Sequence, residues 1–260
     1  MDLHISNRSA LLCGASKGLG RACAERLAAE GVHITLSARE ESRLQQACEE
    51  IRQRHAVRAN YIVADMSTPQ GRAAILSGCP APDILVLCGG WPEVPATTGA
   101  WPAEAWRAAI DAMLLAQVEM ISTLSQGMVK REFGRIVAVT SRLIKDPELR
   151  LAMPAAARLG LTGYIKALSR DIAVHNVTVN SILPGIFETE TQIANTNQLM
   201  AMAGASRQEI VAQRTTATPA GRFGSPDEFS ALCAYLCSRD AGFMTGQAVV
   251  IDGGAHTGIW

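Results

Sequence analysis

The chain has 260 residues, of which 48% are hydrophobic and 18% are charged, and this composition is typical of a folded globular protein rather than a disordered one. The 24 Lys and Arg residues balance the 24 Asp and Glu residues, so net charge offers no general attraction for nucleic acid or an anionic membrane. The sequence shows no signal-peptide pattern and no continuous apolar run of about 18 residues, and its seven cysteines include no Cys-x-x-Cys pair, so we expect a cytoplasmic protein with free thiols, no membrane span and no metal site.

Short β-rich runs alternate with longer helical patterns along the whole chain, which predicts right-handed βαβ units. Several of the runs are almost continuously apolar, as expected for strands covered on both faces. The predicted strands are 9–13, 32–37, 58–63, 84–88, 135–140, 177–183 and 248–251. The predicted helices are 19–30, 41–54, 102–128, 155–174 and 226–237.

This order of elements predicts an α/β fold of the Rossmann-like, doubly wound type. We expect a seven-stranded parallel sheet with helices on both faces, forming a single domain over residues 1–260. No low-complexity linker divides the chain.

A glycine-rich turn follows the first predicted strand with the spacing G-x-x-x-G-x-G. Glycine permits a tight turn, a close approach of the backbone to a pyrophosphate, and close packing of the next helix. The N-terminus of that helix presents unpaired N–H groups to the phosphates. The residues expected to bind the cofactor here are Gly14, Ser16, Lys17, Gly18, Leu19 and Gly20.

The end of the second strand bears on the choice of dinucleotide. An NAD site usually carries a carboxylate there, which accepts from the ribose 2′-OH, whereas this chain continues with Ala38 and Arg39. Arg39 and Lys17 suit a 2′-phosphate, so we expect NADP(H), with NAD(H) less favoured. The alternative is that both are solvated surface cations. Asp65, after the third strand, is expected either to accept from the adenine amine or to cap the next helix.

The segment 142–158 follows the fifth predicted strand and carries four basic residues against two acidic ones. This excess suits a substrate with a carboxylate or phosphate group, although a solvated charged loop gives the same composition. Further along, the polar and Met-rich segment 188–218 interrupts the alternation at a place where a lid would cover the site. Its apolar residues suit either a substrate wall or packing on the body or on a partner subunit; they are Phe187, at its edge, Ile193, Leu199, Met200 and Met202.

Several of these patterns together resemble the short-chain dehydrogenase/reductase family along almost the full chain. The glycine spacing matches, and so do the Pro184–Gly185 pair followed by Thr189, Asn180 in its V-x-V-N run, and the run from Thr245 through Gly254. The resemblance implies an NADP(H)-linked oxidoreductase acting on a small molecule. It further implies that Pro184, Gly185 and Thr189 adjoin the nicotinamide, that Gly89 lines the cofactor site, and that the chain forms a homodimer or homotetramer.

The catalytic half departs from the family pattern of a serine followed thirteen residues later by Tyr-x-x-x-Lys. Ser141 is in place, but the tyrosine position holds Pro154 and the lysine position holds Arg158. The family asparagine is replaced by Met113, and its Asn-Asn-Ala-Gly run is replaced by Leu-Cys-Gly-Gly at 87–90. Because the run after Arg158 follows the family without a gap, the departure lies in the residues and not in the alignment.

Proline has no proton to donate to an alkoxide, and arginine does not titrate near neutral pH. Tyr164 lies ten residues further along the helix and on another face, so we do not expect it to substitute. The candidate catalytic residues are therefore Ser141, Lys145 as a stand-in acid, and Arg158 as a holder of the ribose or of an anion. A solvated loop lysine is the more ordinary explanation of Lys145.

Three functions follow from this pattern. The favoured one is an NADP(H)-linked oxidoreductase of divergent mechanism. The others are a non-redox enzyme that keeps the nucleotide as a structural element, and a cofactor-binding or scaffold protein without turnover. The apolar tail 255–260 suits packing on a neighbouring subunit or on its own body.

Overall fold

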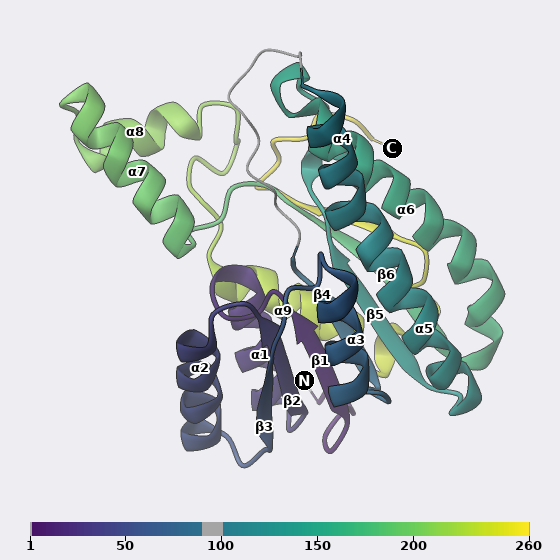
Figure 1. The fold of residues 1–260 in the computed structure, drawn as a ribbon. Helices are drawn as coiled ribbons and strands as arrows, with labels where there is room; N and C mark the ends of the chain where they lie inside the picture. The colour runs from purple at the N-terminus through teal and green to yellow at the C-terminus, as the bar shows by residue number, and fades with distance from the viewer. Residues whose placement is uncertain (1, 90–100, 260) are drawn as a thin grey trace.

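The computed structural model describes residues 2–89 and 101–259, and its centre is one seven-stranded parallel sheet (Figure 1). The strand order is β3-β2-β1-β4-β5-β6-β7. The strands are β1 Ser9–Cys13, β2 His33–Ala38, β3 Ala59–Val63, β4 Ile84–Leu87, β5 Gly134–Val139, β6 Val177–Pro184 and β7 Ala248–Ile251. The predicted doubly wound fold in one domain is confirmed, and each predicted strand is found within one or two residues of its expected bounds.

Helices cover both faces of the sheet, and each face has its own apolar core. One core packs α1 (Gly18–Ala29), α2 (Glu41–Arg54) and α9 (Pro226–Cys237) against the strands. The other packs α3 (Pro69–Gly78), α5 (Ala116–Lys130) and α6 (Ala152–Ile172). α4 (Ala103–Ile110) stands over the carboxyl edge of the sheet, and α7 (Glu190–Ala203) and α8 (Arg207–Arg214) project from it together (Figure 1).

Three helical regions differ from the sequence expectation. α3 was not expected, because it is short and begins in a polar Ser-Thr-Pro run; Thr68 caps it by accepting a hydrogen bond from the N–H of Gly71 (3.0 Å). The long helix expected at 102–128 is α4 and α5 joined by a π-helical turn, Asp111–Leu115. The segment 188–218 contains α7 and α8.

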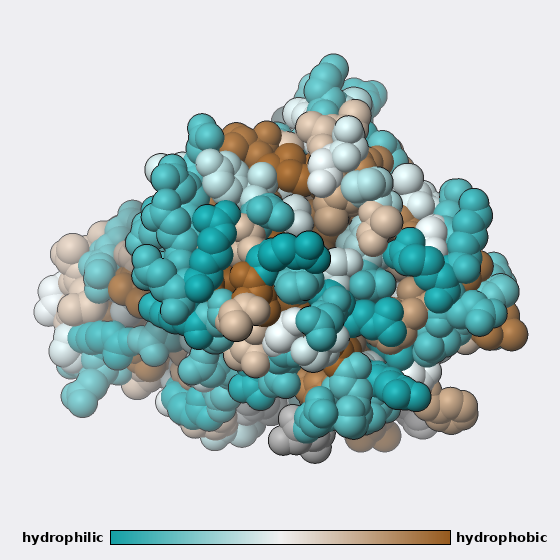
Figure 2. Space-filling model, turned by 90° about the horizontal axis from the view of Figure 1, so that it is seen from below, coloured by the Kyte–Doolittle hydropathy of each residue, from teal (hydrophilic) through white to brown (hydrophobic). Residues whose placement is uncertain are grey.

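One continuous helical stretch, Ala103–Lys130, is long and apolar enough to cross a membrane by length and composition. Its apolar residues are accounted for in another way, because Met120, Ile121 and Leu124 are buried against the sheet. The face seen from the amino-terminal ends of the strands is mainly hydrophilic, with small separated apolar areas among the described residues (Figure 2).

The strand order places the ligand crevice. β1 lies between β2 and β4, so the connections that leave β1 and β4 pass to opposite faces of the sheet. In open α/β sheets, the gap outside the carboxyl ends of two such strands is where ligands bind. The strand order therefore predicts a ligand crevice at the carboxyl edge near β1 and β4.

Candidate active site

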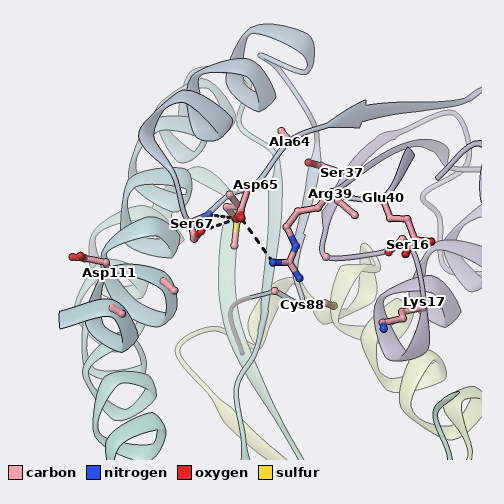
Figure 3. A pocket seen from close by; sticks show the side chains of 16 residues that line it. Ser16, Lys17, Ser37, Arg39, Glu40, Ala64, Asp65, Ser67, Cys88 and Asp111 are labelled. Atoms are coloured by element: carbon pink, nitrogen blue, oxygen red, sulfur yellow. Dashed lines mark hydrogen bonds and ion pairs between the residues drawn. The ribbon is translucent and has the colours of Figure 1, made fainter. Parts of the chain in front are cut away.

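A cavity of about 610 Å³ opens at this position (Figure 3). Its wall consists of the segments that follow the first four strands, together with one side of α4 and the π-helical turn. The lining residues are Gly14, Ser16, Lys17, Ser37, Ala38, Arg39, Glu40, Ala64, Asp65, Met66, Ser67, Cys88, Gly89, Ala108, Asp111 and Ala112. A cavity of this size and shape can hold a nucleotide-sized ligand.

The glycines of the first turn are required by close backbone contacts. Gly14 has a φ of +73°, and a Cβ atom on it would lie 2.8 Å from the backbone nitrogen of Gly89. A Cβ on Gly20 would lie 2.6 Å from the carbonyl oxygen of Gly14. Only glycine fits at either position, so the turn brings β1, β4 and the start of α1 together. This is the geometry that was expected from the spacing.

No side chain caps the N-terminus of α1, so its backbone N–H groups are available to a ligand. Lys17 occupies the N-cap position without a side-chain capping hydrogen bond, and the first turn contains no acidic residue. The backbone N–H groups of this turn and the positive end of the helix dipole therefore face the cavity without an internal anion. A phosphate is the ligand that such an end binds best.

Arg39 and Asp65 both line the cavity and face each other there (Figure 3). Their closest nitrogen and oxygen are 4.0 Å apart, and the Arg39 side chain is 81% exposed. Asp65 also accepts hydrogen bonds from the N–H (2.9 Å) and the hydroxyl (2.7 Å) of Ser67. Burial raises the pKa of Asp65, but the Ser67 hydrogen bonds and the Arg39 charge outweigh it, and the net pKa is lowered.

The alternative role considered for Asp65, that of a helix cap, is wrong. Thr68 occupies the N-cap of α3. The Asp65 carboxylate organises the turn before that helix and remains on the cavity wall.

Pro184 is the last residue of β6, and Gly185 and Thr189 follow it on the other side of the glycine turn. A Cβ on Gly185 would lie 2.7 Å from the Cβ of Asp252, so glycine allows β6 and the turn after β7 to approach closely. The position of a Cβ on Gly18 is 3.6 Å from the methyl group of Thr189. The Thr189 hydroxyl accepts from the N–H of Gln192 (3.4 Å) and caps α7. Thr189 thus lies against the glycine turn that follows β1, and it also begins α7.

The candidate catalytic residues come from the segment after β5 and from α6. Ser141 is buried, and its hydroxyl accepts a hydrogen bond from the N–H of Leu143 (3.2 Å). Lys145 follows the 3₁₀ turn that Ser141 caps, and it is half-buried. Pro154 is the third residue of α6 and is buried. The first helical turn tolerates proline because the missing N–H has no partner there.

Arg158 lies one turn further along α6, and only 5% of it is exposed. Burial lowers the pKa of its guanidinium to about 10. A group with this pKa is still protonated at neutral pH, so α6 carries a desolvated positive charge at Arg158. Such a charge binds anions or hydroxyl oxygens far more strongly than a solvated one.

Tyr164 and Met113 take no part in this arrangement. Tyr164 lines a separate cavity of about 390 Å³ between α5 and α6, where it contacts Ser122. Burial raises the pKa of Tyr164, which makes it a poorer acid than a free phenol. Met113 is fully buried in the π-helical turn.

The structure reveals one polar pair that the sequence gave no reason to expect. The Nδ1 atom of His256 lies 2.6 Å from the Asp146 carboxylate, and the backbone N–H of His256 donates to Asp252 (2.8 Å). The tail after β7 thereby crosses to the segment that follows Ser141. Asp146 and His256 are 110 residues apart. No local pattern signals such a pair. Among the described residues, no group of three or more His, Cys, Asp or Glu side chains could hold a metal ion.

Comparison with known proteins agrees with this geometry. The model of the family described as short chain dehydrogenase matches residues 8–199. The chain belongs to this family. It is 30% identical to the NADPH-dependent reductase BacG of Bacillus subtilis over 98% of this chain and 100% of that protein. It is 26% identical to the 3-oxoacyl-[acyl-carrier-protein] reductase FabG of Aquifex aeolicus over 98% of this chain and 99% of that protein.

A solved structure is similar over its whole length. L-sorbose reductase from Gluconobacter frateurii, complexed with NADPH and L-sorbose, has a TM-score of 0.94 and 29% identity, with 100% of both chains covered. This short chain dehydrogenase therefore shares its fold, from β1 to the tail, with a reductase that holds NADPH and a ketose.

Proposed function

We propose that this protein is an NADP(H)-linked oxidoreductase that reduces a small molecule through an atypical catalytic site. The observation that carries the proposal is the cavity at the β1–β4 crevice, where the glycine turn, the uncapped start of α1 and the Arg39 guanidinium meet. The relatives described above as NADPH-dependent or holding NADPH support the choice of cofactor.

The residues present fit this cofactor. The glycine turn and the N–H groups of α1 would hold the pyrophosphate, and Arg39 with Lys17 would bind the 2′-phosphate. Asp65 would accept from the adenine amine, and Arg158 would bind the nicotinamide ribose. Gly89, Pro184, Gly185 and Thr189 would enclose the nicotinamide end. When bound, the cofactor supplies a hydride; the protein must orient the acceptor and deliver a proton.

Ser141 is the residue that we assign to the substrate oxygen. The residue at 154 carries no acid, so the proton must come from another group. Lys145 is our candidate, because it leaves the same turn that Ser141 caps and is half-buried. A second candidate is His256 of the tail after β7, whose ring nitrogen lies 2.6 Å from the carboxylate of Asp146 in this loop.

The charges around this loop favour an anionic substrate. Arg142 lies 3.6 Å from Glu148, and Asp146 is occupied by His256. Arg142 and Lys145 carry positive charge within four residues of Ser141. A carboxylate- or phosphate-bearing carbonyl compound, or an activated C=C acceptor, would match these charges.

A cofactor-binding protein without turnover is the second candidate function. Pro154 favours it, because a proline at the tyrosine position removes the proton donor while leaving the first turn of α6 intact. A non-redox enzyme on the same scaffold would use Ser141 and the basic residues without consuming the cofactor.

The test combines NADPH fluorescence, which reports binding, with loss of nicotinamide absorbance on a panel of keto acids, ketoses and enones. We expect binding and oxidation of NADPH with at least one acceptor, and loss of turnover with intact binding in Ser141→Ala. The variants Lys145→Met and His256→Gln then distinguish the two candidate proton donors. Only replacement of the residue that donates the proton should remove the limb of the pH–rate profile that reports the ionisation of that residue. Binding without oxidation across the panel would contradict the oxidoreductase and favour the second candidate.

The double variant Pro154→Tyr with Arg158→Lys probes the same site from the other direction. If the nicotinamide is held productively, restoring the phenol and its lysine raises ketone reduction by about 100-fold or more, the usual contribution of general acid catalysis. The single variant Pro154→Tyr restores the tyrosine without the lysine. It is the matched control and should gain less ketone reductase activity than the double variant.

A further inference from the structure

Cys88 occupies an unusual place in the cofactor cavity. It follows β4 directly, is half-buried and lines the cavity wall. Figure 3 shows it in the middle of the cavity, between the Asp65 side and the Ser16–Lys17 side. The family pattern has an amide side chain in this run, so the thiol is a property of this chain.

The Cys88 side chain packs on the first turn of α1. A Cβ on Gly20 would lie 3.2 Å from the Cβ of Cys88. Cys23 is on the same face of α1, three residues after Gly20, and faces the same core. The Cys23 thiol interacts with the thiols of Cys88 and Cys233, and Cys233 interacts in turn with Cys237 of α9. All of these cysteines belong to, or pack against, the same apolar core.

These contacts form a row of thiols that begins at the cofactor cavity and ends in the apolar core. All four cysteines are free. Cys23, Cys233 and Cys237 are fully buried, whereas Cys88 is accessible from the cavity. The interaction with Cys233 is the main cause that raises the pKa of Cys23, so Cys23 reacts less readily than an ordinary thiol with a reagent from outside. A reagent that enters the cavity therefore meets Cys88 first.

We propose that Cys88 is a thiol-modification site that the cofactor shields, and that peroxide converts it to a disulfide with Cys23 when the cavity is empty. The shielding rests on the proposed function, since it requires NADP(H) in this cavity. The disulfide requires only the thiol contact.

The chemistry balances with a peroxide as oxidant. Peroxide oxidises the Cys88 thiol to a sulfenic acid and is itself reduced to water. The Cys23 sulfur then attacks the sulfenic sulfur and forms the S–S bond, while the S–O bond breaks. The thiol proton of Cys23 leaves with the hydroxide as a second water molecule.

The Cys23–Cys88 disulfide would disturb the glycine turn that follows β1. Gly89, next to Cys88, packs so closely on Gly14 that a Cβ there would lie 2.8 Å from the Gly89 nitrogen. Drawing Cys88 toward α1 moves the end of β4 against this turn. We therefore expect the oxidised protein to bind NADPH at least about tenfold more weakly, a change of about 1.4 kcal/mol.

The first experiment measures alkylation by N-ethylmaleimide with peptide mass spectrometry. Cys88 should be modified in the free protein and protected by NADPH. At a cofactor concentration about 100 times its Kd, the labelling rate should fall about 100-fold, because only the free fraction reacts. Cys79 is the internal control: it is also half-buried but does not line the cavity. Its labelling should not depend on NADPH.

The second experiment treats the free protein with hydrogen peroxide and maps disulfides. We expect a Cys23–Cys88 peptide, its absence in Cys88→Ala, and its retention in Cys233→Ala. A Cys23–Cys233 disulfide in the unmodified chain, or no disulfide at all, would overturn the pairing.

The experiments distinguish a failure of the Cys88 proposal from a failure of the proposed function. If fluorescence shows that NADPH binds but Cys88 labels at an unchanged rate, the shielding is wrong. If NADPH does not bind, the proposed function fails, while the peroxide reaction still decides whether Cys88 and Cys23 form the pair.

Discussion

The exposed side chain of Arg39 is the feature on which the proposed preference for NADP(H) depends. It is the only arginine that lines the cavity in the described part of the chain, and its partner Asp65 holds it at 4.0 Å without enclosing it. An 81% exposed guanidinium gains little from such a pair, so it is free to turn toward a phosphate. Under the proposed function, Arg39 would donate charge-assisted hydrogen bonds to the 2′-phosphate, a group that NADH lacks.

Arg39→Ala is expected to weaken NADPH binding about tenfold and to leave NADH binding unchanged. Hydrogen bonds to charged groups contribute about 1.5–3 kcal/mol, and exposure favours the lower end of that range. Fluorescence titration with both cofactors measures the effect. Arg54→Ala, an exposed arginine at the far end of α2, is the matched control. An equal loss for NADH would assign Arg39 to the pyrophosphate instead.

Several residues that line the cavity, among them Gly14, Lys17 and Arg39, could be predicted from sequence, because glycine spacing and strand ends act over a few residues. The Asp65 role could not be resolved this way, since Thr68 and Asp65 are both good N-cap residues and only three positions apart. Backbone geometry decided in favour of Thr68.

At the scale of elements, the start of α9 is held by a capping box. The Ser225 N–H donates to Glu228 (2.8 Å), and the Glu228 N–H donates to the Ser225 hydroxyl (3.2 Å). Arg222 adds an ion pair to Glu228 at 2.6 Å. The Arg222 hydrogen bond is the main cause that lowers the pKa of Glu228 to about 2.

Glu228→Gln should lower the Tm at pH 7, with the deficit shrinking under acid. A depressed folded-state pKa stabilises the native state above the unfolded value of 4.5 and loses this effect as pH falls toward about 2. Thermal melts from pH 7 to pH 3 measure it. Glu209→Gln is the control, because the pKa of Glu209 is lowered by hydrogen bonds to Ser206, without an arginine among the causes. A deficit that persists unchanged at pH 3 would contradict the charge argument.

The helix pair α7–α8 within 188–218 is joined through Arg214. Its guanidinium donates to the hydroxyl of Thr196 (2.9 Å) and to the side chain of Gln192, and it lies 5.1 Å from the centre of the Phe223 ring. We propose that this pair acts as the lid over the site. Helical periodicity was too weak in this stretch to predict either helix.

Arg214→Ala should open the pair and make it more susceptible to proteolysis, by about tenfold if hydrogen bonds of about 1.5 kcal/mol are lost. Limited trypsin or chymotrypsin digestion with mapped cleavage sites measures this, and the global Tm should change little. Arg207→Ala is the control, since Arg207 pairs with Glu188 on the exposed surface, where ion pairs contribute little. Equal digestion of the two variants would assign no special role to Arg214.

At the scale of the whole molecule, the tail after β7 ties distant parts of the carboxyl edge together. The backbone N–H of Gly185 donates to Ile251 (2.9 Å), which closes β6 on β7, and His256 then reaches Asp146 beyond β5. The His256 side chain is only 12% exposed, so this contact is better shielded from water than a surface pair.

His256→Ala should increase amide hydrogen exchange in residues 142–149 and 253–259 together. A lost hydrogen bond of about 1 kcal/mol corresponds to roughly a fivefold rise in local opening. His4→Ala is the control, because His4 pairs with Asp2 where both side chains are exposed. Faster exchange in the tail alone would mean that the pair does not hold the loop after Ser141.

The sequence by itself determined the fold and the glycine turn, because strand–helix alternation and short spacings are local and survive without knowledge of packing. The absence of the tyrosine and lysine pair stays a prediction from the sequence. Only the tertiary structure decided the Asp146–His256 pair, the row of thiols behind Cys88 and the burial that shifts the pKa of Arg158. Each of these depends on contacts between segments that are far apart in the chain, and no periodicity encodes which side chains meet when the layers pack.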